Sequence, residues 1–204
     1  MRIAIAAATL LLASTTACQR KEAPAPPAAA AVAATDANPV VVLETSKGRI
    51  VMQLDRAKAP KTVENIVTHV DGHFYDGLVF HRVIKGFVIQ TGMHIPDGRT
   101  RLSSAPPVPN EADNGLKNVR GSIALARTDD PNSGGVQFYI NVKDNPSLDF
   151  KAKTVAGWGY CVFGRVTAGM DVVDAIAAVP TRPDDDPVTP VVITRAFVDT
   201  TAAR

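Results

Sequence analysis

Two polar side chains, Arg82 and Gln90, interrupt a stretch of the sequence that is otherwise largely apolar. The stretch runs from Phe80 to Gly92 and reads Phe-His-Arg-Val-Ile-Lys-Gly-Phe-Val-Ile-Gln-Thr-Gly. Successive side chains of a strand face opposite sides, so Phe80 and Arg82 are expected on one face, with Gln90 on a second strand beyond a glycine turn. A guanidinium, an amide and two phenylalanine rings would then share one patch, which suits a ligand that is partly apolar and partly amide.

Other chemistries lack their residues in this sequence. His69 and His73 have the spacing of a helical zinc pair, but no general-base glutamate lies between them. Neither Ser122 nor Ser133 has the glycine setting of a serine hydrolase, and no phosphate-binding loop is found. The three acids at 184–186 lie between prolines and are predicted to form a solvated loop. We therefore expect no metal site and no cofactor.

The residues that remain can bind and polarise a ligand but cannot cleave it: Arg82, Phe87, Gln90, Phe138 and Tyr139. Two structural alternatives stay open at this point. Arg82 could be paired with an acid for stability alone, and the aromatic residues could be ordinary core.

Length and composition favour one domain with a sizeable core, because the chain has 204 residues of which 46% are hydrophobic. Lysine and arginine number 22 against 20 aspartates and glutamates, giving a net charge of +2. This balance argues against nucleic acid as a partner.

The amino-terminal residues are predicted to direct the chain out of the cytosol. Residues 1–17 have the positive charge and short apolar run of a signal peptide, and 18–39 form a tether rich in alanine and proline. The sequence before Cys18 resembles a bacterial lipobox, although Thr15 stands where leucine is usual. We expect a bacterial periplasmic or cell-envelope location, with contact to a membrane only through a lipid on Cys18. Cys161 is then left without a disulfide partner and is predicted to be a small buried hydrophobe.

The folded domain is assigned to 40–204, and its periodicity predicts a mainly β fold with two helices. Turn residues separate short apolar runs throughout, which suggests a closed barrel or a sandwich with helices at its ends. The predicted strands are 40–45, 49–54, two within 80–92, 121–126, 136–142, 161–166 and 191–198, the helices begin near Pro60 and Met170, and 93–109 is a surface loop.

The Phe80 to Gly92 stretch resembles the signature of the cyclophilins, the cyclosporin-type peptidyl-prolyl cis-trans isomerases. The resemblance covers essentially 40–198, and the 110–120 segment is most similar to the bacterial periplasmic branch. Further matching segments follow in the family's order: Gly121 to Arg127, Gln137 to Ile140, Leu148-Asp149, Val162 to Val166 and Gly169-Met170. The fold implied is a closed eight-stranded antiparallel β-barrel capped by two α-helices.

The resemblance also implies roles for individual residues. Arg82 corresponds to the catalytic arginine, and Gln90 to the glutamine that binds the substrate backbone. The other residues implied to contact substrate are Phe87, Val88, Ala126, Arg127, Phe138, Tyr139, Leu148 and Tyr160. Ser147 stands where many eukaryotic members have tryptophan, which implies weak cyclosporin binding, and Tyr160 stands where they have histidine.

The function implied is rotation about X-Pro bonds in proline-containing unfolded or flexible polypeptides, carried out by a monomer. A guanidinium directed at the prolyl nitrogen would stabilise the twisted amide more than either planar state, without a covalent intermediate. The alternative is a non-catalytic chaperone, a holdase that binds proline peptides in the same groove.

Overall fold

The sheet consists of eight antiparallel strands whose order along the chain differs from their order in space. The computed structural model describes residues 38–201, so the predicted signal peptide, Cys18 and nearly all of the predicted tether lie outside the described residues. The sheet order is β3-β4-β6-β5-β7-β2-β1-β8. The elements are β1 Val40–Thr45, β2 Gly48–Leu54, α1 Pro60–Asp71, β3 Arg82–Ile84, β4 Val88–Thr91, β5 Ser122–Leu125, β6 Phe138–Asn141, β7 Val162–Ala168, α2 Met170–Ala177 and β8 Ile193–Val198.

The curled sheet is closed by backbone hydrogen bonds just before β3 and at the start of β8. Val79 and Val192 form an isolated antiparallel bridge. The N–H of Phe80 donates to the carbonyl of Val191 (3.0 Å), and the N–H of Ile193 donates to the carbonyl of Leu78 (2.8 Å). The mainly β prediction, with eight antiparallel strands and two helices, is confirmed, and closure rests on this short bridge rather than on a full ladder.

The first hairpin forms where the sequence predicts it. β1 and β2 pair from Val40 opposite Gln53 to Thr45 opposite Gly48. Gly48 has φ +132°, a backbone conformation that side chains with a Cβ rarely adopt. The turn therefore consists of two residues, one fewer than predicted, because the glycine belongs to the ladder.

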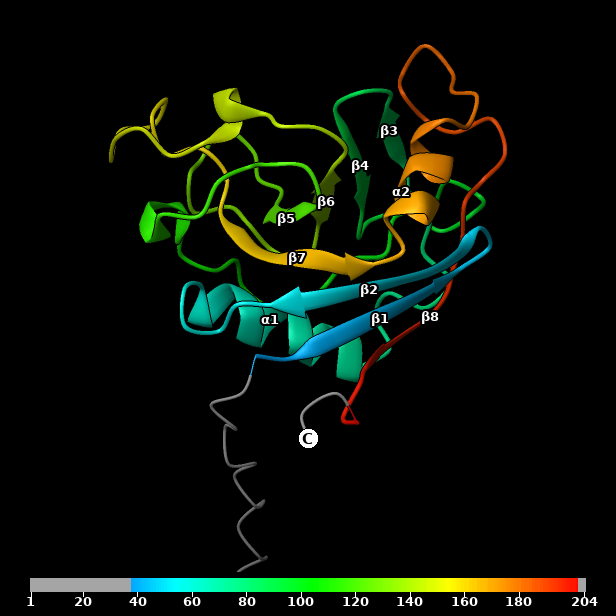
Figure 1. Cartoon of the computed structure of the whole chain (residues 1–204), viewed down its shortest axis with the longest axis horizontal. Helices are drawn as coiled ribbons and strands as arrows, with labels where there is room; N and C mark the ends of the chain where they lie inside the picture. Colours follow the sequence, from blue (N-terminus) through cyan, green and yellow to red (C-terminus); the bar gives the residue numbers. More distant parts are fainter. Residues whose placement is uncertain (1–37, 202–204) are drawn as a thin grey trace, which may run out of the picture. The chain divides into compact units, whose positions relative to one another are not determined.

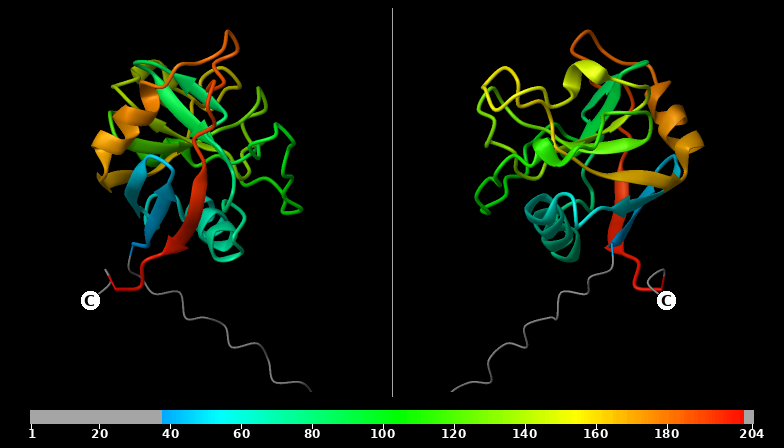
Figure 2. Two further views of the ribbon diagram at one scale, coloured as in Figure 1. Left: turned by 90° about the vertical axis from the view of Figure 1, so that its right-hand side faces the viewer. Right: turned by 60° about the vertical axis from the view of Figure 1, so that its left-hand side comes forward.

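The two helices lie at separate ends of the curled sheet (Figures 1 and 2) and contribute to one core. Pro60 occupies the first turn of α1, where its missing N–H costs nothing. Val63, Ile66 and Val70 recur at helical spacing and are buried together with Val173 and Ile176 of α2. No helix of the described part of the chain has the length and apolar character needed to cross a membrane.

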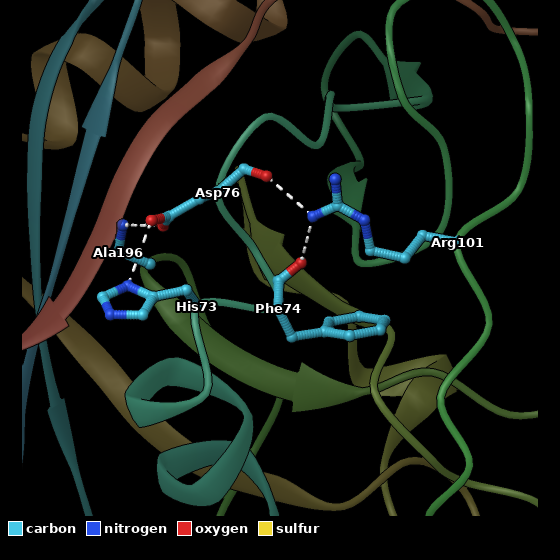
Figure 3. Close-up of polar contacts among 5 residues, drawn as sticks. All are labelled: His73, Phe74, Asp76, Arg101 and Ala196. Atoms are coloured by element: carbon cyan, nitrogen blue, oxygen red, sulfur yellow. Dashed lines mark hydrogen bonds and ion pairs between the residues drawn. The ribbon is translucent and has the colours of Figure 1, made fainter.

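Contacts on two sides anchor the turn that follows α1. Asp76 accepts a hydrogen bond from the backbone N–H of Ala196 in β8 (2.7 Å), and its second carboxylate oxygen lies 3.2 Å from Nδ1 of His73. Arg101 donates from one terminal nitrogen to the carbonyls of Phe74 and Asp76, both at 2.7 Å (Figure 3). Arg101 thus fixes the 93–109 loop, which has no helix or strand of its own, against the body of the fold.

Candidate active site

Three neighbouring strands bring Arg82, Gln90 and Tyr139 side by side. Arg82 of β3 is directly opposite Gln90 of β4, and Gln90 is directly opposite Tyr139 of β6. Residues opposite each other in an antiparallel pair project from the same face of the sheet. The guanidinium, the amide and the ring therefore form one row across the sheet, as expected from the sequence for Arg82 and Gln90.

This row borders a groove with a volume of about 200 Å³. Every residue predicted to be catalytic or to bind substrate, except Phe138, lines it. The lining residues are Arg82, Phe87, Val88, Gln90, Ala126, Arg127, Tyr139, Leu148 and Tyr160. Five stretches of the sequence thus meet here: the hairpin from β3 to β4, the pair Ala126 and Arg127, and the single residues Tyr139, Leu148 and Tyr160.

The structure does not bring Phe138 or Phe80 to the groove. Phe138 is 1% exposed and packs edge-on against Tyr75 and Phe163, with ring centroids 5.5 and 6.3 Å away. It precedes Tyr139 on β6, so the alternation of the strand directs it into the main core. Phe80 is also fully buried there, because β3 begins only at Arg82 and the expected alternation does not extend back to it.

A small apolar cluster separate from the main core forms the floor of the groove. Its buried members are Val88, Ala124, Tyr139 and Val162. Phe87, Leu116, Ala126, Leu148 and Tyr160 pack against them while remaining partly exposed. Such a floor can accept a compact apolar group such as a pyrrolidine ring, since burying it removes apolar surface from water.

A buried polar network holds Tyr139 from below. Its hydroxyl donates to Oδ1 of Asn118 (2.9 Å), which also accepts from Nδ2 of Asn141 (3.2 Å). The backbone N–H of Asn118 donates to Asp149 (2.8 Å). Burial raises the pKa of Tyr139 well above its usual value, so the hydroxyl keeps its proton. Sequence reasoning missed this network, although Asn141 within an otherwise apolar strand was a signal for it.

Arg127 and Tyr160 build the opposite wall. The guanidinium carbon of Arg127 lies 4.8 Å from the ring centroid of Tyr160, and its Nε donates to the carbonyl of Gly159 (2.8 Å). The Tyr160 ring in turn meets the ring of Tyr139 edge-on at 5.8 Å. Tyr160 is thus a stacked part of the groove wall, in the groove where the resemblance had implied a substrate contact for it.

Gln137 orients the amide of Gln90. Nε2 of Gln90 donates to Oε1 of Gln137 (3.0 Å), and Nε2 of Gln137 lies 3.3 Å from Sδ of Met93. Donating through Nε2 leaves the Gln90 carbonyl oxygen to accept from a peptide N–H. Gln137 occurs in one of the matching segments but was not predicted as a site residue.

Two further groups near the site have shifted pKa values. Burial, together with the charges of His94 and Arg82, lowers the pKa of His81 to about 4, so this ring is neutral at neutral pH. Burial raises the pKa of the Cys161 thiol to about 12. Cys161 is 2% exposed, which confirms the prediction of a buried hydrophobe rather than a nucleophile.

Asp185 makes a contact that the sequence analysis did not predict. The acids at 184–186 lie in a partly exposed loop, as expected, but Oδ2 of Asp185 lies 3.6 Å from Nε of Arg82. The side chains of both residues remain partly exposed at the edge of the groove.

Residues 40–198 match the family model described as "Cyclophilin type peptidyl-prolyl cis-trans isomerase/CLD". The chain is 54% identical over 162 residues to peptidyl-prolyl cis-trans isomerase cyp18 of Streptomyces antibioticus, covering 78% of this chain and 97% of that protein. It is 48% identical over 142 residues to peptidyl-prolyl cis-trans isomerase B of Escherichia coli K12, covering 70% of this chain and 86% of that protein.

A similar solved structure is that of a Cryptosporidium parvum cyclophilin type peptidyl-prolyl cis-trans isomerase in the presence of the dipeptide Ala-Pro. It has a TM-score of 0.69 and 25% sequence identity, and the match covers 79% of this chain and 99% of that one. The family match over most of the chain, the identities to named isomerases and the shared fold show that this chain belongs to the cyclophilin-type peptidyl-prolyl cis-trans isomerases and is an isomerase.

Proposed function

We propose that Arg82 accelerates rotation about X-Pro bonds by acting on the prolyl nitrogen, with no covalent intermediate. The observation that carries this proposal is the row of Arg82, Gln90 and Tyr139 on adjacent strands, which places the guanidinium and the amide beside the apolar floor to which Tyr139 belongs. The groove lining of the described chain includes no serine, cysteine or carboxylate. Its side chains are therefore suited to binding and polarising an amide rather than to attacking it.

The amide barrier of about 18–20 kcal/mol arises because the nitrogen lone pair is delocalised into the carbonyl. In the twisted state the lone pair is localised on nitrogen and can accept a hydrogen bond. A guanidinium at that point stabilises the twisted state more than either planar state, which is the condition for catalysis. Lowering the barrier by about 5 kcal/mol would accelerate rotation roughly 10³- to 10⁴-fold.

The remaining lining residues hold one side of the bond while the other turns. The proline ring would rest on Phe87, Val88, Tyr139 and Leu148, and Gln90 would bind the neighbouring backbone. Ala126 and Arg127 would border the peptide. The Cryptosporidium relative was solved with an Ala-Pro dipeptide, and we propose that this chain takes X-Pro segments of flexible polypeptides in the same way.

The experiment is NMR exchange spectroscopy on a proline-containing tetrapeptide with the purified protein. Arg82→Ala and Arg82→Lys should each lower turnover by about 10²- to 10³-fold, the usual loss when one donor to a developing charge is removed. Lysine should not rescue activity because it lacks the planar fork of donors. The matched control is Arg99→Ala, an arginine on the surface loop paired with Asp97 at 2.7 Å, which should retain full turnover.

Full turnover in Arg82→Ala with an unchanged circular dichroism spectrum would refute the role of Arg82. The same assay distinguishes the holdase alternative. A pure binder would shift the peptide's resonances on binding without raising the exchange rate between cis and trans forms.

We also propose that the substrates are envelope or secreted polypeptides and that the chain belongs to the bacterial periplasmic branch. The support is the signal-like sequence at 1–17, the lipobox-like residues before Cys18 and the similarity of 110–120 to that branch. We further propose that the protein is a monomer and that a lipid on Cys18 attaches it to a membrane. Mass spectrometry of the mature amino terminus tests the anchor, since an unmodified Cys18 or cleavage elsewhere would rule it out.

A further inference from the structure

The loop between α2 and β8, at 178–192, is attached to β3 beside the arginine of the groove. The backbone N–H of Val83, the residue after Arg82, donates to the carbonyl of Asp185 (2.8 Å). This bond places the loop against the strand that carries Arg82, and Figure 1 shows the loop as the orange segment that follows α2.

The tip of this loop has a defined shape. Thr181 and Pro187 form an antiparallel bridge. The N–H of Arg182 donates to the carbonyl of Asp186 (2.8 Å), and the N–H of Asp185 donates to the carbonyl of Arg182 (3.1 Å). The Arg182 guanidinium also bonds the Asp186 carboxylate and the carbonyl of Pro187. The tip is therefore a closed turn that can hold a side chain at a set position.

Asp185 itself has φ +67°, in the left-handed region. Most residues avoid this region, whereas aspartate and asparagine tolerate it better than others. The turn thus adopts a costly backbone conformation at the residue whose carboxylate lies 3.6 Å from Nε of Arg82.

Stability does not account for this arrangement. The side chains of Arg82 and Asp185 are 43% and 40% exposed, and an ion pair at that exposure contributes only about 0–1 kcal/mol. What the pair does is restrain the Nε edge of a planar group. Among residues 38–201, the Arg82 side chain donates no hydrogen bond, so its two terminal nitrogens are left for a ligand in the groove.

We propose that Asp185 is a positioning residue for Arg82, holding the Nε edge of the guanidinium so that its terminal nitrogens face the prolyl nitrogen. The proposal rests on the function proposed above for Arg82. Arginine is long and flexible, and within the described part of the chain Arg82 has no ion pair besides the one with Asp185. Restraining a catalytic group in its productive geometry raises kcat without adding contacts to the bound substrate.

The test is a comparison of Asp185→Asn with Asp184→Asn in the full-length protein, using an uncharged X-Pro peptide. Asparagine removes the charge but tolerates the left-handed backbone. We expect Asp185→Asn to lower kcat about threefold to tenfold with KM within about twofold, a loss of orientation rather than of binding. Asp184 is exposed, has no hydrogen bond or ion pair among the described residues, and should behave as wild type.

Two further measurements separate positioning from other effects. At about 1 M NaCl, where the Debye length falls to about 3 Å, the kcat of the wild type should approach that of Asp185→Asn, and the variant should change little. In an Arg82→Lys background, Asp185→Asn should cause no comparable additional loss.

Wild-type kcat in a folded Asp185→Asn protein would overturn the proposal. So would a change in KM with kcat unaffected, because Asp185 would then affect peptide binding rather than the orientation of Arg82. These outcomes are distinct from failure of the proposed function, which would show as full turnover in Arg82→Ala.

Discussion

The hydrogen bond beneath the groove, from the Tyr139 hydroxyl to Asn118, has an energetic consequence that can be worked out from its neighbours. In Asn118→Ala, Nδ2 of Asn141 still donates to Oγ of Ser122 (2.9 Å). Asp149 loses the bond from Nδ2 of Asn118 (3.2 Å) but keeps the bond from the backbone N–H of the same residue (2.8 Å), so the Tyr139 hydroxyl is the group left without a partner. An orphaned buried polar group costs about 1–3 kcal/mol, and the lost side chain adds a small cavity. We expect a total loss of about 2–4 kcal/mol in the free energy of unfolding.

Tyr139→Phe should cost much less. The oxygen of Asn118 keeps the bond from Asn141 at 3.2 Å, so no group is orphaned and the loss is about 1 kcal/mol. In the Asn118→Ala background, Tyr139→Phe removes a hydroxyl that has no partner. There it should leave the free energy of unfolding unchanged or raise it. The coupling energy of this double-mutant cycle is then about 1–2 kcal/mol.

Urea unfolding of the four proteins, followed by circular dichroism, measures these values. In a parallel thermal scan, the melting temperature should fall by about 2–4 °C for each kcal/mol of lost stability. The control is Tyr160→Phe, which removes a hydroxyl that has no hydrogen-bond partner among the described residues, and should cost less than about 0.5 kcal/mol. Equal costs of Tyr139→Phe in both backgrounds would refute the reasoning.

Two other predictions concern the surroundings of the site. The pKa of His81 is about 4 in the folded protein against 6.5 in the unfolded chain, so between pH 6.5 and 4 the unfolded state binds the proton more readily. The free energy of unfolding should therefore fall by up to about 3 kcal/mol as the pH is lowered from 6.5 to 4. Urea titrations of His81→Gln at several pH values should show a smaller fall, and an equal fall in both proteins would contradict the lowered pKa of His81. At Gly92, with φ +101°, a Cβ would lie 2.5 Å from the carbonyl oxygen of Val136. Gly92→Ala should therefore lower the free energy of unfolding, measured in urea, by about 2–4 kcal/mol. The control is Gly86→Ala, at φ +67° with no neighbour within 4 Å, which should lower it by only about 1–2 kcal/mol. Equal losses would show that the backbone shifts to remove the clash between the new Cβ and Val136.

The sequence was informative where local chemistry determines structure. Gly48 predicted the first turn, Pro60 the start of α1, and the apolar repeat of Val63, Ile66 and Val70 its buried face, all close to the observed elements. The row of Arg82 and Gln90 also followed from alternation along a hairpin, since both residues lie within one short segment.

The prediction was less successful where a residue's face depends on where a strand begins. Phe80 was expected beside Arg82, but the strand starts after it, and Phe138 was expected at the groove although its neighbour Tyr139 already occupies that face of β6. Because neighbouring residues of a strand face opposite sides of the sheet, only one of Phe138 and Tyr139 can line the groove.

Contacts between distant segments could not be read from the sequence at all. Nothing local to Asp185 indicates that its carboxylate meets Arg82, or that Gln137 accepts a hydrogen bond from Gln90. Such pairs depend on the register between strands and on the path of loops, which only the assembled sheet determines.

The closure of the sheet bears on how the protein is made. β8 is synthesised after the other seven strands, yet it pairs along β1 and its first residues bond to the segment before β3. Until the ribosome has released β8, the nascent chain therefore has two unpaired strand edges, and pairings between such distant residues form slowly. For that interval the isomerase is itself an unfinished chain with exposed edges, the same kind of molecule on which we propose it acts.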